Sequence, residues 1–275
     1  MKETSFRQQY GPWALVTGAA AGLGCEFAQQ LAAKGLHLIL VDRDEVPLRQ
    51  LAAQLAETDA IETKPVTVDL ADADFMQVIT AAAEGLEVGL LINNAGASLV
   101  RLFAQATPAQ LQIILDVNTR APLHLAHHFG QQMLTRRRGG VIFLSSFSAY
   151  QGSLLVGTYA ATKAFNLILA ESLWAEWREQ GVNVLGFAPG STDTPGFREA
   201  NPQTQRATIV SVMSAADTVA EALAALGKQP SAIAGWRNRL AYFLTVRLLP
   251  RRWAIRLVSQ NMRQLYPHII NGDEA

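Results

Sequence analysis

The chain has 275 residues, 49% of them apolar and only 17% charged, a composition that supports a sizeable core and excludes a disordered protein. Its balanced charge excludes a global attraction to nucleic acid, and its single cysteine, Cys25, excludes an internal disulfide. No apolar run reaches about 18 residues and the first residues lack the apolar core of a signal peptide, so we expect a cytoplasmic protein without a membrane-spanning helix.

Short apolar runs alternate with amphipathic segments along most of the chain. The runs predict strands at 13–17, 36–42, 65–69, 88–94, 141–146, 182–188 and 231–234. The segments between them predict helices at 22–34, 45–57, 72–84, 108–134, 157–180 and 215–226. Apolar strands separated by helices are typical of a parallel sheet that is covered on both faces. We therefore predict an α/β fold in which one doubly wound parallel sheet of about seven strands forms a domain over residues 1–235, with 236–275 as a helical extension.

A glycine-rich turn follows the first predicted strand. In TGAAAGLG, Gly18, Gly22 and Gly24 let a pyrophosphate approach the backbone without meeting a Cβ atom. The helix that follows directs its free N–H groups and positive dipole end at the phosphates. By itself this turn is ambiguous, because alanine–glycine turns also pack helices closely on strands and its spacing differs from the GxGxxG fingerprint.

An acidic residue at the end of the next strand strengthens this interpretation. Asp42 lies 18 residues after Gly24, where a carboxylate can accept hydrogen bonds from the adenosine ribose hydroxyls and repel a 2′-phosphate. This favours NAD as the cofactor. Arg43 is adjacent and could bind a 2′-phosphate if Asp42 turned aside, so NADP stays possible.

The stretch GTYAATKAF places Tyr159 four residues before Lys163, so in a helix the two side chains share one face. Such pairs are common, and alone this one could be a half-buried aromatic beside a solvated cation. Ser146, taken alone, is typical of a strand-end serine, and Asn118 is typical of a helix cap or kink. Only the combination of motifs favours a catalytic site.

Five motifs occur in a fixed order: TGAAAGLG, NNAG at 93–96, Ser145–Ser146, Tyr159-x-x-x-Lys163, and PG at 189–190. Together they make residues from about 13 to 235 resemble the short-chain dehydrogenase/reductase family, and Ser146 precedes Tyr159 by the 13 residues that the family uses. The resemblance implies a Rossmann-type sheet, a nicotinamide cofactor, and interconversion of a secondary alcohol and a ketone.

The resemblance implies catalytic roles for Asn118, Ser146, Tyr159 and Lys163. Tyr159 would give a proton to the ketone oxygen, and Lys163 together with the oxidised nicotinamide would lower the pKa of its phenol. Lys163 would also hold the nicotinamide ribose. Ser146 would hydrogen-bond the substrate oxygen, and Asn118 would anchor a water that relays protons to Lys163.

The remaining implied cofactor contacts lie in the loops that leave the strands. Besides Tyr159 and Lys163 they are Gly18, Ala20, Gly22, Leu23, Gly24, Asp42, Arg43, Asp69, Leu70, Asn94, Ala95, Gly96, Pro189, Gly190, Thr192 and Thr194. Asp69 is equally well interpreted as the cap of the following helix. Thr194 is our choice for the hydroxyl near the nicotinamide amide, with Thr192 as its rival.

The histidines on the long predicted helix are unlike a metal site. His124, His127 and His128 have no acidic or cysteine partner nearby in the sequence, so we expect no metal and interpret them as packing or subunit-contact residues. In the family, helices at about 108–134 and 157–180 commonly form a dimer interface. We therefore expect a homo-oligomer, dimer or tetramer, with Trp174 and Trp177 as core or interface residues. Cys25, in an alanine-rich helix, is best explained by core packing.

The extension is basic and amphipathic. Seven arginines alternate with apolar residues between 236 and 266, and Pro250 splits the stretch into two helices. Three interpretations stay open: a helix on an anionic membrane surface, a lid or dimer arm over the substrate pocket, or ordinary packing. Nucleic-acid binding is disfavoured because no aromatic stacking platform accompanies the arginines.

The function predicted from these patterns is an NAD(P)-dependent oxidoreductase of a secondary alcohol or ketone. The tail resembles those of bacterial reductases of fatty-acyl or lipophilic ketones, which suggests a lipophilic substrate, acyl, steroid-like or similar. The loop 190–214 and the tail should shape the pocket, but their residues do not identify a specific molecule. The alternative is a catalytically silent dinucleotide-binding regulatory or scaffold protein, which loss of the serine, tyrosine or lysine would have favoured.

Overall fold

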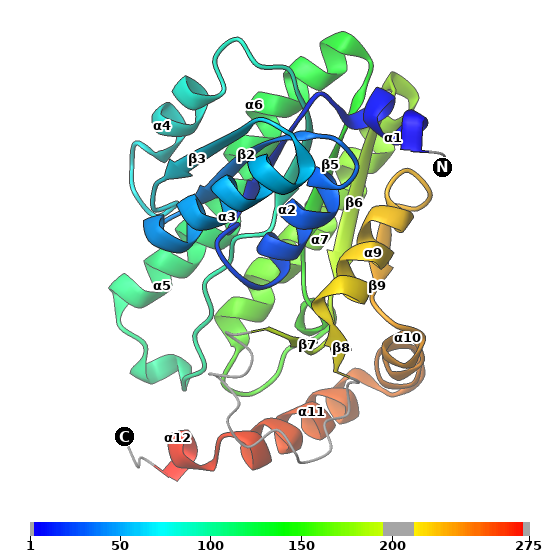
Figure 1. The fold of residues 1–275 in the computed structure, drawn as a ribbon. Coiled ribbons are helices and arrows are strands. Elements are labelled where there is room, and N and C mark those ends of the chain that lie inside the picture. Colours follow the sequence, from blue (N-terminus) through cyan, green and yellow to red (C-terminus); the bar gives the residue numbers. More distant parts are fainter. Residues whose placement is uncertain (1–2, 195–211, 272–275) are drawn as a thin grey trace.

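The computed structural model describes residues 3–194 and 212–271 (Figure 1). Its centre is one parallel sheet in the order β3-β2-β1-β4-β5-β6-β9, which confirms the predicted doubly wound arrangement. The strands are β1 (Trp13–Thr17), β2 (His37–Asp42), β3 (Thr63–Thr67), β4 (Val88–Asn93), β5 (Gly139–Leu144), β6 (Val182–Ala188) and β9 (Ser231–Ile233). A separate parallel pair is formed by β7 (Thr192–Asp193) and β8 (Met213–Ser214).

Helices cover both faces of the sheet (Figure 1). On one face pack α2 (Gly22–Ala32), α3 (Glu45–Asp59) and α9 (Ala215–Ala225), and on the other pack α4 (Phe75–Ala82), α6 (Ala121–Arg136) and α7 (Gly157–Trp177). Strand residues alternate between the two cores: Ala14 and Val16 of β1 face the first, whereas Trp13 and Leu15 face the second. Because both faces are buried, the strands read as continuous apolar runs, which is why the sequence predicted them well.

Three local features differ from the predicted elements. An additional helix, α1 (Glu3–Tyr10), precedes the first strand. The helix predicted at 108–134 is interrupted: α5 (Pro108–Leu115) passes through a π-helical turn at Asp116–Arg120 into α6. The third strand ends at Thr67, two residues earlier than predicted, so Asp69 lies in the loop that follows it.

The extension folds into helices at the end of the molecule to which β6 points (Figure 1). It contains α10 (Trp236–Tyr242), a π-helical turn at Phe243–Leu248, α11 (Arg251–Leu265) and α12 (Pro267–Asn271). Pro250 separates the turn from α11, as predicted, because proline lacks the N–H that would continue the helix. The division of the chain into a domain at 1–235 and an extension at 236–275 stays a prediction.

Candidate active site

The glycine-rich turn between β1 and α2 has the conformation that its glycines were expected to permit. Gly18 has φ +66° and Gly22 φ +57°, values that side chains other than glycine rarely adopt. A Cβ atom on Gly24 would lie 1.9 Å from the carbonyl oxygen of Gly18, so helix α2 begins closer to the strand than any other residue would allow. The turn therefore leaves bare backbone at the helix N-terminus, as a diphosphate requires.

The NNAG segment after β4 is bonded directly to the back of this turn. Asn94 Nδ2 donates to the carbonyl oxygens of Thr17 (2.8 Å) and Gly18 (3.1 Å). The Thr17 hydroxyl accepts hydrogen bonds from the backbone N–H groups of Asn94 and Ala95, and donates to Ile92 O. Asn94 thus supports the glycine turn from behind. The sequence analysis missed Thr17, although a buried threonine closing an apolar strand is a signal for such a bond.

A pocket opens beside the turn at the carboxyl ends of β1, β2 and β4. It brings together seven residues predicted to contact the cofactor, namely Gly18, Asp42, Arg43, Asp69, Leu70, Ala95 and Gly96. Its other lining residues were not predicted: Val41, Asp44, Val68, Ala97, Ile113 and Val117. Five other residues that were predicted to contact the cofactor line a second pocket, described below: Leu23, Pro189, Gly190, Thr192 and Thr194.

Carboxylates dominate the charge of the first pocket. Asp42 accepts hydrogen bonds from the backbone N–H groups of Ala20 (2.9 Å) and Asp44 (3.1 Å), which fix its side chain at the strand end. Arg43 is exposed and lies 3.9 Å from the Asp44 carboxylate. Asp69 accepts a hydrogen bond from Ala71 N–H. Since α4 begins only at Phe75, the alternative that Asp69 caps this helix is wrong.

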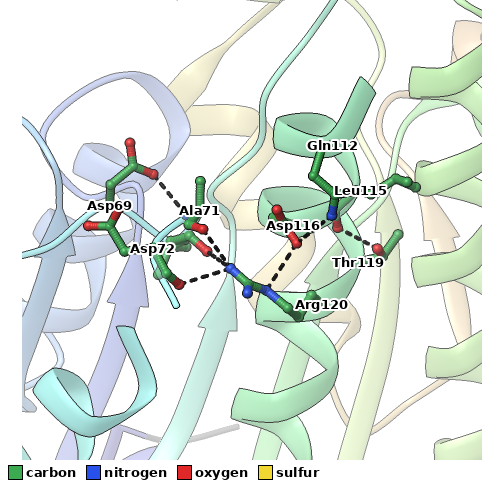
Figure 2. A network of polar contacts seen from close by, with 9 residues as sticks. Asp69, Ala71, Asp72, Gln112, Leu115, Asp116, Thr119 and Arg120 are labelled. Carbon is green, nitrogen blue, oxygen red and sulfur yellow. Dashed lines mark hydrogen bonds and ion pairs between the residues drawn. The ribbon is translucent and has the colours of Figure 1, made fainter. Parts of the chain in front are cut away.

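Arg120 connects this pocket to the π-helical turn (Figure 2). Its guanidinium donates to the carbonyl oxygens of Leu70 (3.2 Å), Ala71 (2.7 Å) and Asp72 (2.9 Å). Its Nε lies 3.1 Å from Asp116 at the start of the turn. One side chain therefore holds the loop after β3 in place, and no pattern in the sequence had indicated it.

Asn118 lies fully buried in the same π-helical turn. Its Oδ1 accepts a hydrogen bond from Ala97 N–H (2.7 Å), and its Nδ2 donates to Ala97 O (2.9 Å) and to the Thr162 hydroxyl (3.0 Å). The side chain thereby joins the segment after β4 to helix α7, next to Lys163. The water-anchoring role implied for Asn118 stays a prediction.

Lys163 points from α7 into the protein and is 4% exposed. Its Nζ donates to Leu144 O at 2.9 Å and lies 5.7 Å from the centroid of the Tyr159 ring. A Cβ atom on Gly96 would lie 3.1 Å from this Nζ, so the glycine of NNAG makes room for the ammonium group. Burial lowers the pKa of Lys163 to about 8.

Tyr159 is half-buried one turn before Lys163, as the spacing predicted. Burial raises the pKa of its phenol, and a hydrogen bond with Ser146 lowers it by less. In the folded protein, loss of hydration opposes the phenolate more strongly than the hydrogen bond favours it. The phenol is therefore held in the protonated form, which is the form that donates a proton to a ketone oxygen. The lowering of this pKa by Lys163 together with the oxidised nicotinamide stays a prediction.

The two serines after β5 have different surroundings. Ser145 is buried and its hydroxyl donates to Lys163 O at 2.7 Å, which ties the strand end to α7. Ser146 instead lines the second pocket, and its Oγ accepts hydrogen bonds from the N–H and the hydroxyl of Ser148. Ser146 is thus the serine that can reach a substrate beside Tyr159.

The second pocket has walls from the core of the fold and from the extension. Core residues are Leu23, Ser146, Phe147, Ser148, Gln151, Ser153, Val156 and 189–192 with Thr194, and the extension adds Val258, Asn261, Met262, Leu265 and Tyr266. The Leu154 N–H donates to Ser259 Oγ at 3.2 Å, and the rings of Tyr150 and Tyr242 lie 4.5 Å apart. Of the three interpretations of the extension, α11 as a wall of the pocket agrees with these contacts.

The two threonines near the second pocket occupy different positions. Thr192 is buried and its hydroxyl donates to Gly190 O. Thr194 lies against the glycine turn, where a Cβ atom on Gly22 would be 3.4 Å from its Cγ2. This position favours Thr194 as the cofactor-side hydroxyl. The rest of the loop predicted to shape the pocket, 195–211, lies outside the described residues.

The other residues singled out in the sequence, namely the histidines, Trp177 and Cys25, make packing or hydrogen-bond contacts within the fold. His127 and His128 each contact a glutamine one turn further along α6, and among the described residues no three His, Cys, Asp or Glu side chains form a metal-binding group. Trp177 is a core residue: a Cβ atom on Gly130 would lie 2.4 Å from its ring. Burial, followed by the charge of Glu26, raises the pKa of the Cys25 thiol, which therefore is not activated.

Known proteins match the chain over most of its length. Residues 12–205 match the family described as short chain dehydrogenase. A 7beta-hydroxysteroid dehydrogenase from Collinsella aerofaciens is 33% identical over 238 residues, which cover 86% of this chain and 90% of that protein. A very-long-chain 3-oxoacyl-CoA reductase from Pyricularia oryzae is 37% identical over 179 residues, which cover 63% of this chain and 54% of that protein.

Solved structures agree with the same assignment. One from a study of 7beta-hydroxysteroid dehydrogenase stereoselectivity superimposes with a TM-score of 0.85 at 29% identity, covering 91% of this chain and 98% of that one. A short-chain dehydrogenase from Sphingobium yanoikuyae in complex with NADPH gives a TM-score of 0.72 at 27% identity, covering 82% and 87%. The chain therefore belongs to the short-chain dehydrogenase/reductase family and is an NAD(P)-binding oxidoreductase of alcohol and ketone groups with a Rossmann fold.

Proposed function

We propose that this protein interconverts a bulky, lipophilic secondary alcohol and its ketone, with NAD as the preferred cofactor. The observation that carries the proposal is the position of Ser146. It hydrogen-bonds the Tyr159 phenol and lines a pocket that α11 also lines, and Gly96, which lines the carboxylate-lined pocket, lies next to the Lys163 ammonium.

In this mechanism Tyr159 donates its phenolic proton to the ketone oxygen during reduction and accepts it back during oxidation. Ser146 hydrogen-bonds the same oxygen and stabilises the negative charge that develops there. Lys163, anchored on Leu144 O, holds its charge near the phenol and supports the ribose. A nicotinamide cofactor held by the glycine turn and Lys163 would supply or remove the hydride. Cβ atoms at Gly18 and Gly24 would clash with Asn94, Ala95 and the Gly18 carbonyl, so these glycines permit the tight turn that presents the N-terminus of α2, where a diphosphate would bind.

The preference for NAD rests on the charges of the adenosine-side pocket. Asp42, Asp44 and Asp69 line it, with Arg43 as the single cation among its lining residues. A 2′-phosphate would add negative charge next to carboxylates that the backbone already holds in place. Similar proteins have been solved with NADPH and NADP, so the choice needs a direct test.

That test is a fluorescence titration of the protein with NADH and with NADPH. We expect tighter binding of NADH, and we expect Asp42→Asn to narrow or reverse the difference because it removes the repulsive charge while keeping the side-chain shape. Glu57→Gln, an exposed carboxylate near the end of α3, is the matched control. Tighter binding of NADPH by the unmodified protein would refute the preference.

We propose a fused-ring, steroid-like alcohol as the substrate class. The pocket offers apolar side chains from both walls, including Phe147, Val156, Met262 and Leu265. The steroid dehydrogenase match extends over most of both chains, whereas the acyl-CoA reductase match covers about half of that protein. Gln151 lines the same pocket, is 7% exposed, and among the described residues its Oε1 has no hydrogen-bond partner. A polar substituent of the substrate would satisfy it.

The activity test compares hydroxysteroids and their ketones with 3-oxoacyl thioesters, followed by absorbance of the reduced cofactor. We expect turnover of the fused-ring compounds, its loss in Tyr159→Phe, and a raised KM with a largely kept kcat in Gln151→Leu. Faster turnover of the thioesters would refute the substrate class. Tight cofactor binding with no turnover of any alcohol or ketone would instead favour the silent regulatory or scaffold protein.

A homo-oligomer is also proposed. Leu115 of α5, Leu123 of α6 and Phe165 of α7 are exposed and line one hollow on the helices expected at the interface, and Ile168 of α7 is also exposed. Light scattering after size-exclusion chromatography should give a dimer or tetramer, and Ile168→Glu should shift it toward the monomer. A monomer in the unmodified protein would contradict this proposal.

A further inference from the structure

The extension carries large apolar side chains that no other described part of the chain covers. Along α10 and the π-helical turn they recur at helical spacing, on one stripe, and two more follow on α11. These residues, each 39–63% exposed, are Trp236, Leu240, Phe243, Leu244, Leu248, Leu249, Trp253 and Leu257. We call them, with the arginines between them, the tail surface. Single exposed apolar residues need no explanation, but eight on neighbouring helices mark an interaction site.

The charge of the tail surface has one sign. Residues 236–271 contain seven arginines and no acidic residue, and all seven are exposed. Of these seven arginines, only Arg239 has an acidic partner among the described residues, Glu221 at 3.2 Å. Arg252 and Arg256 lie on the ring of Trp253, 6.0 and 5.3 Å from its centroid. The surface therefore presents uncompensated cations next to apolar side chains.

The combination of exposed apolar side chains and cations distinguishes between the partners that could bind the tail surface. A second copy related by a two-fold axis would place the same arginines opposite one another, which opposes pairing through this surface. Nucleic acid would meet the cations but gain nothing from the leucine stripe. An anionic bilayer satisfies both, because apolar side chains enter the boundary between headgroups and acyl chains while tryptophan and arginine side chains remain at the headgroups.

We propose that the tail surface docks the protein onto anionic phospholipid bilayers. The protein would lie on the bilayer, since in the described part of the chain no helix is both long and apolar enough to span one. The opposite face of α11 lines the substrate pocket through Val258, Met262 and Leu265. If the proposed function holds, docking brings the pocket close to the phase into which a lipophilic alcohol partitions.

The experiment is flotation of the full chain with large vesicles of phosphatidylcholine, with and without phosphatidylglycerol. We expect binding only to the anionic vesicles and its decrease with salt. Arginine near an anionic surface contributes about 1 kcal/mol, a factor of about five in partitioning, so Arg252→Gln with Arg256→Gln should weaken binding about 30-fold. Phe243→Ser with Leu244→Ser should also weaken it.

Matched controls lie on α3, where Val46 and Arg49 are exposed. Val46→Ser and Arg49→Gln should leave binding unchanged, and thermal unfolding of every variant checks its fold. Equal binding to neutral and anionic vesicles, or tail variants that bind like the controls, would overturn the proposal. Analytical sedimentation without lipid tests the alternative that a second copy of the chain binds the tail surface. If the tail variants change self-association but not vesicle binding, this alternative is correct and the proposal fails. Vesicle binding is measured without substrate or turnover. A negative result would therefore refute membrane docking without bearing on the proposed enzymatic activity.

Discussion

The buried ammonium of Lys163 gives a prediction about stability that can be worked out in detail. The side chain is 4% exposed, and no carboxylate of the described chain forms an ion pair with it. Burial lowers its pKa from 10.5 to about 8. Because each pH unit between these values is worth about 1.4 kcal/mol, keeping the charge in the folded protein costs about 3 kcal/mol at neutral pH.

The direction in which the free energy of unfolding changes with pH follows from the number of protons that each state binds. Between about pH 8 and 10.5 the unfolded chain holds the lysine proton and the folded protein has released it, so the free energy of unfolding rises with pH in this window. Below about pH 8 both states are protonated and the full cost remains. Lys163→Met removes the cost, and it also removes the hydrogen bond to Leu144 O, worth about 1 kcal/mol.

We therefore expect the cofactor-free Lys163→Met protein to be about 2 kcal/mol more stable than the unmodified protein at pH 7, while its turnover is lost. The advantage should shrink as the pH rises toward 10.5. Urea unfolding of both proteins across this range measures the difference, in which all other titrating groups cancel. A variant that is less stable at neutral pH, with an unchanged dependence on pH, would refute the reasoning.

Three further predictions concern the site. Tyr159→Phe should lower kcat by about 10²–10⁴-fold while NADH fluorescence titration still shows binding, because only the donated proton is lost; full turnover would remove the acid role. Arg120→Met should weaken cofactor binding by releasing the loop at Leu70–Asp72, whereas Arg49→Met, exposed on α3, should not; equal affinities would show that the loop needs no anchor. Asn118→Leu should destabilise the protein by about 2–4 kcal/mol in urea unfolding, since the buried backbone polar groups of Ala97 lose their partners; a neutral effect would contradict this.

The sheet, its helices and the Tyr159–Lys163 pair could be predicted because they depend on periodicity and spacing, which a sequence displays directly. Helix α1 was missed because only Phe6 and Tyr10, four residues apart, carry its apolar signal, and both are buried. The π-helical turn adds one residue to a helical turn without changing the composition, so the sequence predicted a continuous helix there.

The parts of the site that escaped prediction depend on distances between segments far apart in the chain. Arg120 meets the loop after β3 across about 50 residues, and Thr17 meets the turn after β4 across more than 70. The effect of burial on the Tyr159 pKa could not be predicted for a related reason. Spacing places a cation near the phenol, but how far water is excluded depends on the packed structure around both groups.

The wall that α11 contributes has a consequence for how this catalyst is assembled and how it diversifies. The catalytic helix and the glycine turn belong to the core of the fold, whereas one wall of the proposed substrate cavity comes from α11, much later in the chain. New selectivity can therefore arise by exchanging α11 while the proton-transfer machinery stays untouched.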